Sequence, residues 1–390
     1  MAGLTRAGAT KSRRLPAQAA SDHPIGPDEA IALLAPLLAA RGDVLLAVSG
    51  GPDSIALMRM CSLLAAPAGV ATITVASVDH GLRADSRAEA ERVGGWAREC
   101  GFPHAILTWE GPKPATRVQE LARAARYLLL GAKARDVGAR ILVTAHTRDD
   151  QAETVLMRMA HGSGIAGLAG MRPMTARDGL LHARPLIGIS KARLVATCRA
   201  NGWPFIEDPS NADPRFARAR WRKLAPLLER EGLTARRLAN LAERAAQVEA
   251  ALEMKAVEGF QLACSGRDPD GLSLDMARLA EPEPVEIAMR VLRLALADLQ
   301  GGPARHPPRL ERLEGAMQAL RLAFAARQAM RRSLAGAVLA YDGASRLSLR
   351  REAPRRRGRA RKQAGGAGEA DAQGEPRGKP GNSNASMVLV

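Results

Sequence analysis

Hydrophobic and polar positions follow two rhythms along the first half of the chain. Short apolar runs rich in Val, Leu and Ile alternate with longer segments in which apolar residues recur at helical spacing. The short runs predict strands at 43–48, 71–78, 104–108 and 140–144, and the segments between them predict helices. Because strands that alternate with helices form parallel sheets covered on both faces, we expect an α/β fold with a doubly wound parallel sheet.

The pattern changes to helices alone near residues 215–230. Helices are expected at 233–256, 284–299 and 310–330, and alternation of apolar and polar residues over 334–349 predicts a hairpin. A mainly helical C-terminal domain is therefore expected to follow the α/β domain.

The expected organisation has four parts. Residues 25–222 form the α/β domain and residues 223–353 the mainly helical domain. Residues 1–24 are a basic arm without periodicity, and 354–390 are a basic tail rich in Pro and Gly; both are expected to be disordered. The Ala, Ser and basic residues of the arm also suit a transit peptide, but a flexible arm is the favoured interpretation.

Charge points to a polyanionic partner. The 390-residue chain has a formal net charge of +17, which favours nucleic acid, although part of that charge lies in the Arg-rich run 355–362 of the tail. No apolar run reaches the ~18 residues that a membrane-spanning helix needs, so no membrane partner is expected. The four cysteines are widely spaced and form no CxxC pair, which predicts free thiols and a cytoplasmic protein.

The most informative segment is the turn after the first predicted strand. It reads Ser49-Gly50-Gly51-Pro52-Asp53-Ser54. An apolar pattern at helical spacing follows it directly, and a proline is tolerated in a first helical turn. The glycines let the backbone approach a ligand, while the N–H groups and the helix dipole favour an anion; we expect a phosphate chain. Neither Gly-x-x-x-x-Gly-Lys-Ser/Thr nor Gly-x-Gly-x-x-Gly is present in the sequence.

Two further polar segments follow predicted strands. Asp79 and His80 come directly after the second strand, and residues 146–153 come after the fourth. Since ligands bind beyond the carboxyl ends of such strands, we expect these segments and the glycine turn to form one site. An Asp at a strand end suits a ribose hydroxyl or a magnesium ion, and a His there suits phosphate.

Carboxylates dominate the later part of this candidate site. Asp150 and Glu153 are three residues apart and share one face of a predicted helix. Two neighbouring carboxylates suit the binding of an ammonium group, of a magnesium ion, or of both. Asp53 of the glycine turn is a further candidate magnesium ligand.

Two more segments are candidates for contact with the substrate. Residues 161–171 are too rich in Gly for a helix and predict a flexible loop, either a lid or a plain linker. A dense group of cations favours phosphate contact over a merely solvated basic face. The group comprises Arg215, Arg218, Arg220, Arg222 and Lys223, with Trp221 among them.

The motifs carry a family resemblance. SGGPDS resembles the pyrophosphatase loop of the PP-loop ATPases, which cleave ATP to AMP and pyrophosphate and adenylate a carbonyl oxygen. The whole set, over roughly residues 43–228, resembles the bacterial tRNA(Ile)-lysidine synthases. The matching segments are SGGPDS, DHGLR, AHTRDDQAET, HGSGIAGLAGM and RPLIGISK with EDPSNADPRFARARWRKLAPLL. HGSGIAGLAGM and the segment from DPSN to the arginines are specific to this one family.

The resemblance implies a reaction on the wobble cytidine of tRNA(Ile) with a CAU anticodon. ATP, with Mg²⁺, adenylates the C2 oxygen of the base and releases pyrophosphate. The ε-amine of free lysine then attacks C2 and displaces AMP, which gives lysidine. The helical domain is expected to hold the acceptor and stem regions of the tRNA.

The resemblance also implies roles for single residues. Asp53 holds the magnesium ion, and Asp150 and Glu153 bind the amine of lysine. One of these two accepts a proton, because a free lysine amine has a pKa near ~10.4. Arg218 or Arg222 neutralises the adenylate phosphate or the lysine carboxylate, and the sequence does not choose between them. The implied ATP-binding residues are Ser49, Gly50, Gly51, Pro52, Asp53, Ser54, Asp79 and His80.

The sequence departs from the family pattern in places and leaves rival functions open. His161 stands where members often have Arg, Lys223 stands where they often have His, and a second C-terminal domain is expected to be shortened or absent.

The main rival function is that of another PP-loop tRNA-modifying enzyme, a 2-thiolase, although the cysteine spacing argues against it. A small-molecule synthetase and a non-catalytic RNA-binding protein are the others. The oligomeric state is not predicted.

Overall fold

A computed structural model of the protein describes residues 23–39, 42–64, 72–114, 116–177, 179–207, 217–281, 283–302 and 308–352. The chain divides into two compact units. Unit 1 comprises Met1–Gln261 with Glu286–Val291, and unit 2 comprises Leu262–Val285 with Leu292–Val390. The tail 354–390 and nearly all of the arm 1–24 lie outside the described residues.

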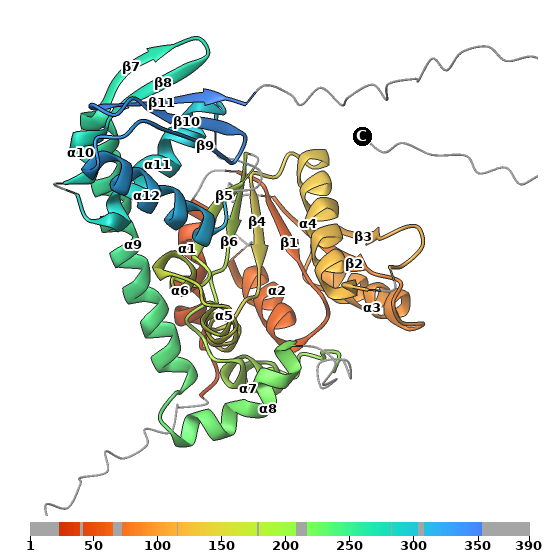
Figure 1. The fold of residues 1–390 in the computed structure, drawn as a ribbon. Coiled ribbons are helices and arrows are strands. Elements are labelled where there is room, and N and C mark those ends of the chain that lie inside the picture. The colour runs from red at the N-terminus through yellow and green to blue at the C-terminus, as the bar shows by residue number, and fades with distance from the viewer. Residues whose placement is uncertain are drawn as a thin grey trace, which may run out of the picture. The chain divides into compact units, whose positions relative to one another are not determined.

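A six-stranded sheet forms the centre of unit 1 (Figure 1). In chain order the strands are β1 Val44–Ala47, β2 Ile73–Asp79, β3 His104–Thr108, β4 Ile141–Thr144, β5 Met174–Arg177 and β6 Leu180–Ala183. They lie in the order β3-β2-β1-β4-β6-β5; the first five are parallel, and β5 pairs antiparallel with β6. β1 is central, because Val44 lies opposite Ile73 on one side and Ile141 on the other. The predicted parallel sheet is confirmed.

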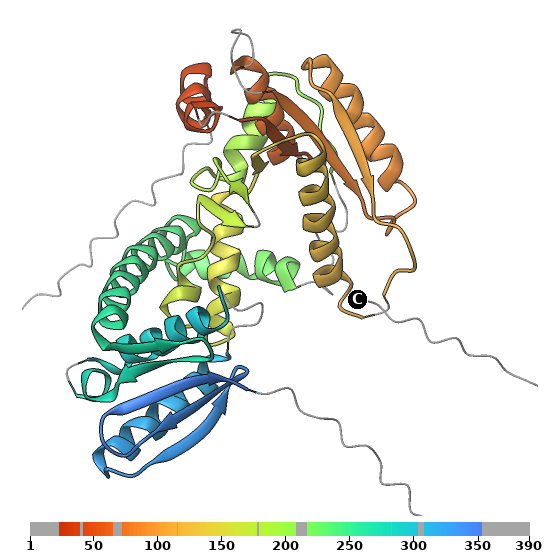
Figure 2. The same cartoon turned by 90° about the horizontal axis from the view of Figure 1, so that it is seen from above.

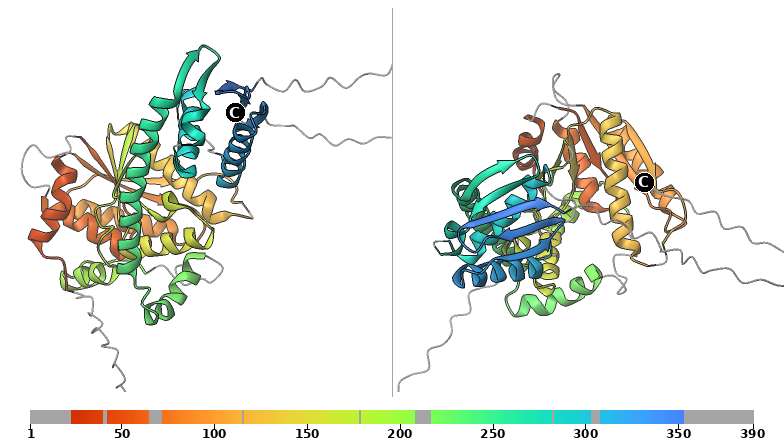
Figure 3. Two further views of the ribbon diagram at one scale, coloured as in Figure 1. Left: turned by 60° about the vertical axis from the view of Figure 1, so that its left-hand side comes forward. Right: turned by 45° about the horizontal axis from the view of Figure 1, so that its top comes forward.

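Helices cover both faces of this sheet (Figure 2). Those of unit 1 are α1 Pro27–Ala39, α2 Pro52–Leu64, α3 Ser86–Glu99, α4 Val118–Asp136, α5 Arg148–Ala160, α6 Ile165–Leu168, α7 Lys191–Ala200 and α8 Ala217–Arg230. The long helix α9, Ala235–Ala263, begins in unit 1 and ends two residues into unit 2 (Figure 3). No helix within the described residues of either unit is long and apolar enough to span a membrane.

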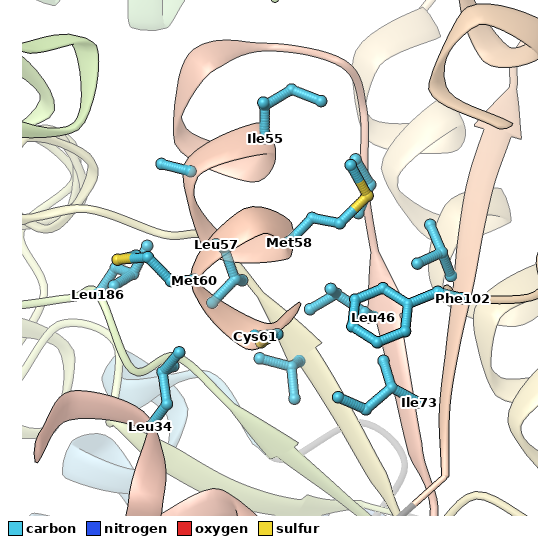
Figure 4. Close-up of a cluster of buried hydrophobic side chains, with 14 of the residues drawn as sticks. Leu34, Leu46, Ile55, Leu57, Met58, Met60, Cys61, Ile73, Phe102 and Leu186 are labelled. Carbon is cyan, nitrogen blue, oxygen red and sulfur yellow. The ribbon is translucent and has the colours of Figure 1, made fainter. Parts of the chain in front are cut away.

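Alternating side chains of β1 divide the core into two layers. Leu46 packs with Met58 of α2 and Phe102, and that cluster also contains residues of α1, α3 and α7 (Figure 4). Leu45, the next residue along, packs on the opposite face with Leu130 of α4. Both faces of β1 are therefore buried, which is why its sequence is a continuous apolar run. Burial of each large side chain contributes about 1.5–3 kcal/mol, so the central strand is firmly held.

Unit 2 contains a five-stranded antiparallel sheet in the order β7-β8-β11-β10-β9. Its strands are β7 Cys264–Asp268, β8 Gly271–Asp275, β9 Met330–Leu334, β10 Ala337–Tyr341 and β11 Arg346–Arg351. The helices are α10 Met276–Ala280, α11 Val285–Leu299, which spans the division between the units, and α12 Leu310–Ala325. Tyr341 of β10 packs against Phe324 of α12, with 6.1 Å between ring centroids.

The structure confirms one local prediction, corrects another and adds hairpins. The hairpin predicted over 334–349 is confirmed as β10 and β11, but β5–β6, β7–β8 and β9–β10 are additional hairpins that the sequence pattern did not indicate. The helix expected over 310–330 ends at Ala325, and Met330 opens β9. Short strands of this kind are stabilised by their partners and by tertiary packing, so local periodicity indicates them poorly.

Candidate active site at the carboxyl edge of the sheet

The turn between β1 and α2 has a conformation that requires glycine at one position. Gly50 has a φ of +90°, and a Cβ built on it would lie 2.6 Å from Ile206 Cδ1. Its carbonyl accepts a hydrogen bond from the Ile206 N–H at 2.9 Å. Ser54 fixes the other side of the turn, since its hydroxyl donates to the Gly51 carbonyl at 2.9 Å and accepts from the Ser49 N–H at 3.2 Å. The first N–H groups of α2, which opens at Pro52, are therefore held in place for an anion.

The segments after β1, β2 and β4 emerge at one edge of the sheet. β2 and β4 flank β1 and run parallel to it, so their carboxyl ends are neighbours. The charges of Asp149, Asp150 and Arg222 all act on Asp53 of the turn. The structure thus places the glycine turn and the segment 146–153 beside each other.

Asp79, the last residue of β2, closes the turn into α3. Its Oδ1 accepts hydrogen bonds from the Gly81 N–H at 2.9 Å and from the Ser86 hydroxyl at 2.5 Å. The bond from Ser86, with a smaller effect of the Gly81 N–H, lowers the pKa of Asp79 below its usual value. Asp79 is therefore an ionised carboxylate that also organises the loop beside the glycine turn.

His80 offers a hydrogen-bond donor at the same edge. It packs edge-on against Trp109 with 6.3 Å between ring centroids, and Arg126 of α4 donates to its Nε2 at 2.9 Å. A guanidinium can only donate, so Nε2 accepts and the proton of the neutral ring is on Nδ1. Burial, reinforced by the charge of Arg126, lowers the pKa of His80 to about 4. Nδ1 is buried and has no hydrogen-bond partner among the described residues, so its N–H is an unsatisfied donor in this structure.

The acidic pair of α5 faces two arginines of α8. Glu153 Oε1 accepts from Arg222 Nε at 2.5 Å. Asp150 Oδ1 lies 3.8 Å from Arg222 Nη2 and 3.9 Å from Arg218 Nη1. The other oxygen of Asp150 caps α5, because it accepts from the N–H and the hydroxyl of Thr147 at 2.9 and 3.0 Å. The two carboxylates therefore form a cation site that Arg222 occupies in this structure.

Burial makes Glu153 and Asp53 weaker acids than usual. Burial raises the pKa of Glu153, although the hydrogen bond from Arg222 opposes that shift. Burial also raises the pKa of Asp53 to about 6, against the charge of Lys191, whose Nζ lies 3.8 Å from Asp53 Oδ2. Raised carboxylate pKa values show that the cations present do not offset the cost of burial, so a further cation would be stabilised here.

Asp53 has the properties of a magnesium ligand. Its Oδ1 is buried and has no hydrogen-bond partner in the part of the chain that the structure describes. The described residues contain no group of three or more His, Cys, Asp or Glu side chains placed to hold a metal ion. One or two carboxylates, with the remaining ligands from phosphate and water, is the usual arrangement for Mg²⁺ that accompanies a nucleotide. The donor set therefore fits Mg²⁺ bound together with a phosphate chain.

The starts of α5 and α7 are tied together beside the site. Asp149 Oδ2 accepts from the Lys191 N–H at 2.8 Å, and the Arg148 N–H donates to the Ile189 carbonyl at 2.8 Å. These bonds fix the helix end that carries Lys191 next to Asp53. Asp149 is thus a cap for α7, and its neighbour Asp150 faces the arginines.

The glycine-rich segment 161–171 is more ordered than its composition predicted. It contains the short helix α6, and Arg158 of α5 donates to the carbonyls of Gly167 and Gly170, each at 2.8 Å. Gln151 donates to the Met171 carbonyl at 2.9 Å and accepts from its N–H at 2.7 Å. The predicted flexible loop is therefore held along its second half by side chains of α5.

The basic residues of α8 have different environments. Arg218 and Arg222 are half-buried against the acidic pair, whereas Arg220 and Lys223 are exposed. Arg215 lies outside the described residues. The structure brings both candidate arginines to the site, and the shorter contact belongs to Arg222.

Sequence reasoning missed a pair of histidines that meet at one hydroxyl. His146, which follows β4, and His182 of β6 both contact the hydroxyl of Thr144, at 2.7 and 2.8 Å. Burial lowers the pKa of His146 to about 4 and that of His182 to about 3. His146 lies inside a motif that the sequence had already marked, but His182 belongs to a strand that periodicity did not predict.

Comparison with known proteins places this fold and site in a class. The family described as PP-loop domain matches residues 28–228. The chain is therefore a PP-loop protein, in agreement with the glycine turn between β1 and α2.

Named relatives show to which family of PP-loop proteins the chain belongs. The tRNA(Ile)-lysidine synthase of Methylobacterium nodulans is 54% identical over 321 residues, which are 82% of this chain and 93% of that protein. Those of Methylobacterium sp. strain 4-46 and Bradyrhizobium sp. strain BTAi1 are 53% and 46% identical, each over 86% of this chain and 97% of the relative. The chain belongs to the tRNA(Ile)-lysidine synthase family.

A solved structure has a weaker likeness. The U34-tRNA thiolase NcsA from Methanococcus maripaludis, with its [4Fe-4S] cluster, matches with a TM-score of 0.49 and 15% identity over 56% of this chain and 77% of that chain. A likeness of this size does not bear on activity.

Proposed function

We propose that the protein attaches free lysine to C2 of the wobble cytidine of tRNA(Ile) with a CAU anticodon, at the expense of ATP. AMP, pyrophosphate and lysidine-containing tRNA are the products. Membership of the tRNA(Ile)-lysidine synthase family supports the reaction. The single structural observation that carries the proposal is the acidic pair of half-buried Asp150 and buried Glu153, set beside the glycine turn and already holding a cationic side chain.

The first half-reaction needs a held phosphate chain and an activated carbonyl oxygen. Ser49, Gly50, Gly51 and Ser54, with Pro52 opening the helix, are proposed to bind the pyrophosphate part of ATP. Asp79 and His80 complete the nucleotide site, His80 through its free Nδ1–H. The C2 oxygen of cytidine attacks the α-phosphorus and pyrophosphate leaves. Mg²⁺ held by Asp53 would neutralise phosphate charge there.

The second half-reaction needs a neutral amine. Asp150 and Glu153 are proposed to bind the ε-ammonium of lysine, and Glu153, whose pKa is raised by burial, to accept its proton. The amine then attacks C2, and the bond from C2 to the adenylate oxygen breaks as AMP leaves. The substrate lysine must share the two carboxylates with Arg222 or displace it from them. A displaced Arg222 becomes available to the AMP phosphate or to the lysine carboxylate. Arg218 has the same chemistry at a longer distance.

Further parts of the proposal concern organisation and place. Residues 25–222 are proposed as the catalytic domain and 223–353 as the tRNA-binding domain, with the basic segments 1–24 and 354–390 outside both. The site of action is proposed to be the cytoplasm, where tRNA, ATP and free lysine occur together. Cys61, Cys100, Cys198 and Cys264 are free thiols, as expected for a reducing compartment.

The decisive experiment uses radiolabelled lysine, ATP and an unmodified tRNA(Ile) transcript with a CAU anticodon. We expect label in the RNA when cytidine is at the wobble position, and none when it is replaced by uridine or when ATP is omitted. The rival 2-thiolase would instead incorporate sulfur and leave lysine free. Label that enters the RNA irrespective of the wobble base would contradict the proposal.

A further inference from the structure

A chain of hydrogen bonds runs beneath the carboxyl end of β4. Arg184 Nη2 lies 2.9 Å from His182 Nδ1, and His182 Nε2 lies 2.8 Å from Thr144 Oγ1. Thr144 Oγ1 in turn lies 2.7 Å from His146 Nδ1. Thr144, His182 and Arg184 are 9%, 8% and 9% exposed, so water does not compete for these bonds. His146 is half-buried and forms the outer end of the chain.

Arg184 sets the direction of every bond in this chain. A guanidinium has donors and no acceptor, so His182 Nδ1 must accept. A neutral imidazole carries one proton, which is then on His182 Nε2 and is donated to the Thr144 oxygen. The Thr144 hydroxyl has one proton of its own, and the one other hydrogen-bonding atom that it contacts among the described residues is His146 Nδ1. His146 therefore accepts at Nδ1, and its own proton is on Nε2.

We propose that Arg184, acting through His182 and Thr144, fixes His146 as the Nε2–H tautomer, so that His146 presents a hydrogen-bond donor to an anionic oxygen of the substrate. In this assignment His146 is the residue that touches substrate, and Thr144, His182 and Arg184 are positioning residues. A histidine held in this way is not a general base at neutral pH, because its one unprotonated nitrogen is occupied by Thr144.

The charges around His146 agree with a neutral ring. Burial is the largest influence and lowers its pKa, as do the charges of Arg184, Arg123 and Arg218; Asp150 is the opposing charge. Arg184 has no carboxylate partner among the described residues. Its Nη1 donates to the Arg172 carbonyl at 2.8 Å and contacts the Thr175 hydroxyl at 3.3 Å. An uncompensated buried cation at one end of the chain disfavours a second positive charge on either imidazole.

The edge at which His146 lies also contains the acidic pair and the glycine turn. An oxygen that gains negative charge there is either a phosphoryl oxygen of the nucleotide or an oxygen on the base. The identity of this oxygen rests on the proposed function, whereas the tautomer of His146 does not.

The tautomer is measured directly in the full-length protein. Histidine ring ¹⁵N resonances distinguish a protonated nitrogen from an acceptor, and the His146→Gln variant assigns the signals of this residue among the seven histidines. At pH 7.5 we expect a protonated Nε2 and an acceptor Nδ1 for His146. A protonated Nδ1, or an imidazolium, would overturn the proposal whatever reaction the enzyme performs.

Variants of Thr144 test whether the chain sets the tautomer. Thr144→Ser keeps the hydroxyl and is expected to leave the His146 spectrum unchanged. Thr144→Val removes the hydroxyl and is expected to give a mixture of both tautomers. An unchanged spectrum in a folded Thr144→Val protein contradicts the proposal, and the wild-type spectrum remains decisive if that variant does not fold.

The role as donor is tested by turnover. The amide N–H of glutamine can lie near the place of His146 Nε2–H, whereas that of asparagine lies near Nδ1. We expect His146→Ala and His146→Asn to lose about 10²-fold or more in kcat, and His146→Gln to stay within about tenfold of the wild type. If glutamine is as poor as alanine while ring protonation follows the pH profile of kcat, His146 is a base and the proposal is wrong.

Discussion

Arg222 Nε lies 2.5 Å from Glu153 Oε1, so the carboxylate proposed to receive the amine of lysine is already paired with a side chain of the protein. Glu153 is only 9% exposed in its side chain, and an unpaired carboxylate there would be costly. An internal arginine therefore keeps the buried acid compensated until a substrate ammonium arrives. This relationship suggests that lysine binding and movement of Arg222 are linked.

Replacing Glu153 tests the proposed amine site. Glu153→Gln removes the charge that an ammonium needs, and a hydrogen bond to a charged group is worth about 1.5–3 kcal/mol, so the KM for lysine should rise about 10–100-fold. The KM for ATP should change little. Steady-state kinetics with each substrate varied in turn provide the measurement. Glu91→Gln, at a carboxylate 60% exposed and paired with Arg87, is the matched control. A selective rise in the KM for ATP would place Glu153 elsewhere in the reaction.

Two adjacent glycines separate strain from ligand contact. Gly50→Ala forces a left-handed backbone and a 2.6 Å approach to Ile206, so we expect a loss of about 1–3 kcal/mol in the free energy of unfolding together with loss of ATP binding. At Gly51 a Cβ meets nothing nearer than Ser49 Oγ at 3.9 Å. Gly51→Ala should therefore fold normally and weaken ATP binding through contact with the nucleotide. Denaturant unfolding and calorimetric titration with ATP measure the two effects. Normal ATP binding by both variants would show that the turn does not hold phosphate.

Asp53 should couple magnesium to nucleotide binding. In the wild type, adding Mg²⁺ should strengthen ATP binding, because the ion joins Asp53 to the phosphates. In Asp53→Asn we expect the Mg²⁺-dependent gain to fall about tenfold or more, measured by calorimetry with and without the ion. Asp136→Asn, at an exposed carboxylate of α4 paired with Lys133, is the control. An equal Mg²⁺ effect in both variants would remove Asp53 from the metal site.

The buried histidine His182 should make the protein sensitive to acid. The pKa of His182 in the folded protein, about 3, lies below the ordinary histidine value of 6.5, so at acid pH unfolding takes up a proton. Its contribution to stability is complete above pH 6.5 and is lost as the pH falls toward 3. Between pH 7.5 and pH 5 this residue should account for about 2 kcal/mol of lost stability. In His182→Gln the fall in the free energy of unfolding over that range should be smaller by this amount. An identical fall in wild type and variant would contradict the assignment, and His161→Gln controls for replacing an exposed histidine.

Salt should weaken tRNA binding steeply. With several phosphates neutralised, affinity should fall about 10²-fold or more between about 50 and 200 mM salt, measured by filter binding. Deleting residues 354–390 should reduce this salt dependence and leave turnover at saturating tRNA mostly intact. Loss of turnover in the truncated protein, at tRNA concentrations that saturate it, would make the tail part of the substrate site.

The sequence by itself determined the parallel sheet, the glycine turn and the approximate places of the polar segments after β1, β2 and β4. It could do so because β1 is buried on both faces and therefore reads as an unbroken apolar run, while Gly50 and Pro52 are residue types that a tight strand-to-helix turn demands. These signals are local and survive in a single sequence.

Only the tertiary structure decided which charges face one another. Arg222 and Glu153 are 69 positions apart, and His182 reaches Thr144 across 38, so no local pattern links them. The hairpin β5–β6 has no clear periodicity in the sequence, yet β6 contains His182 and is followed by Arg184. These two residues set the direction of the hydrogen bonds beneath the site. Pairing of ions and hydrogen-bonding groups is set by the distances and burial that packing creates, and residue order alone does not contain those distances.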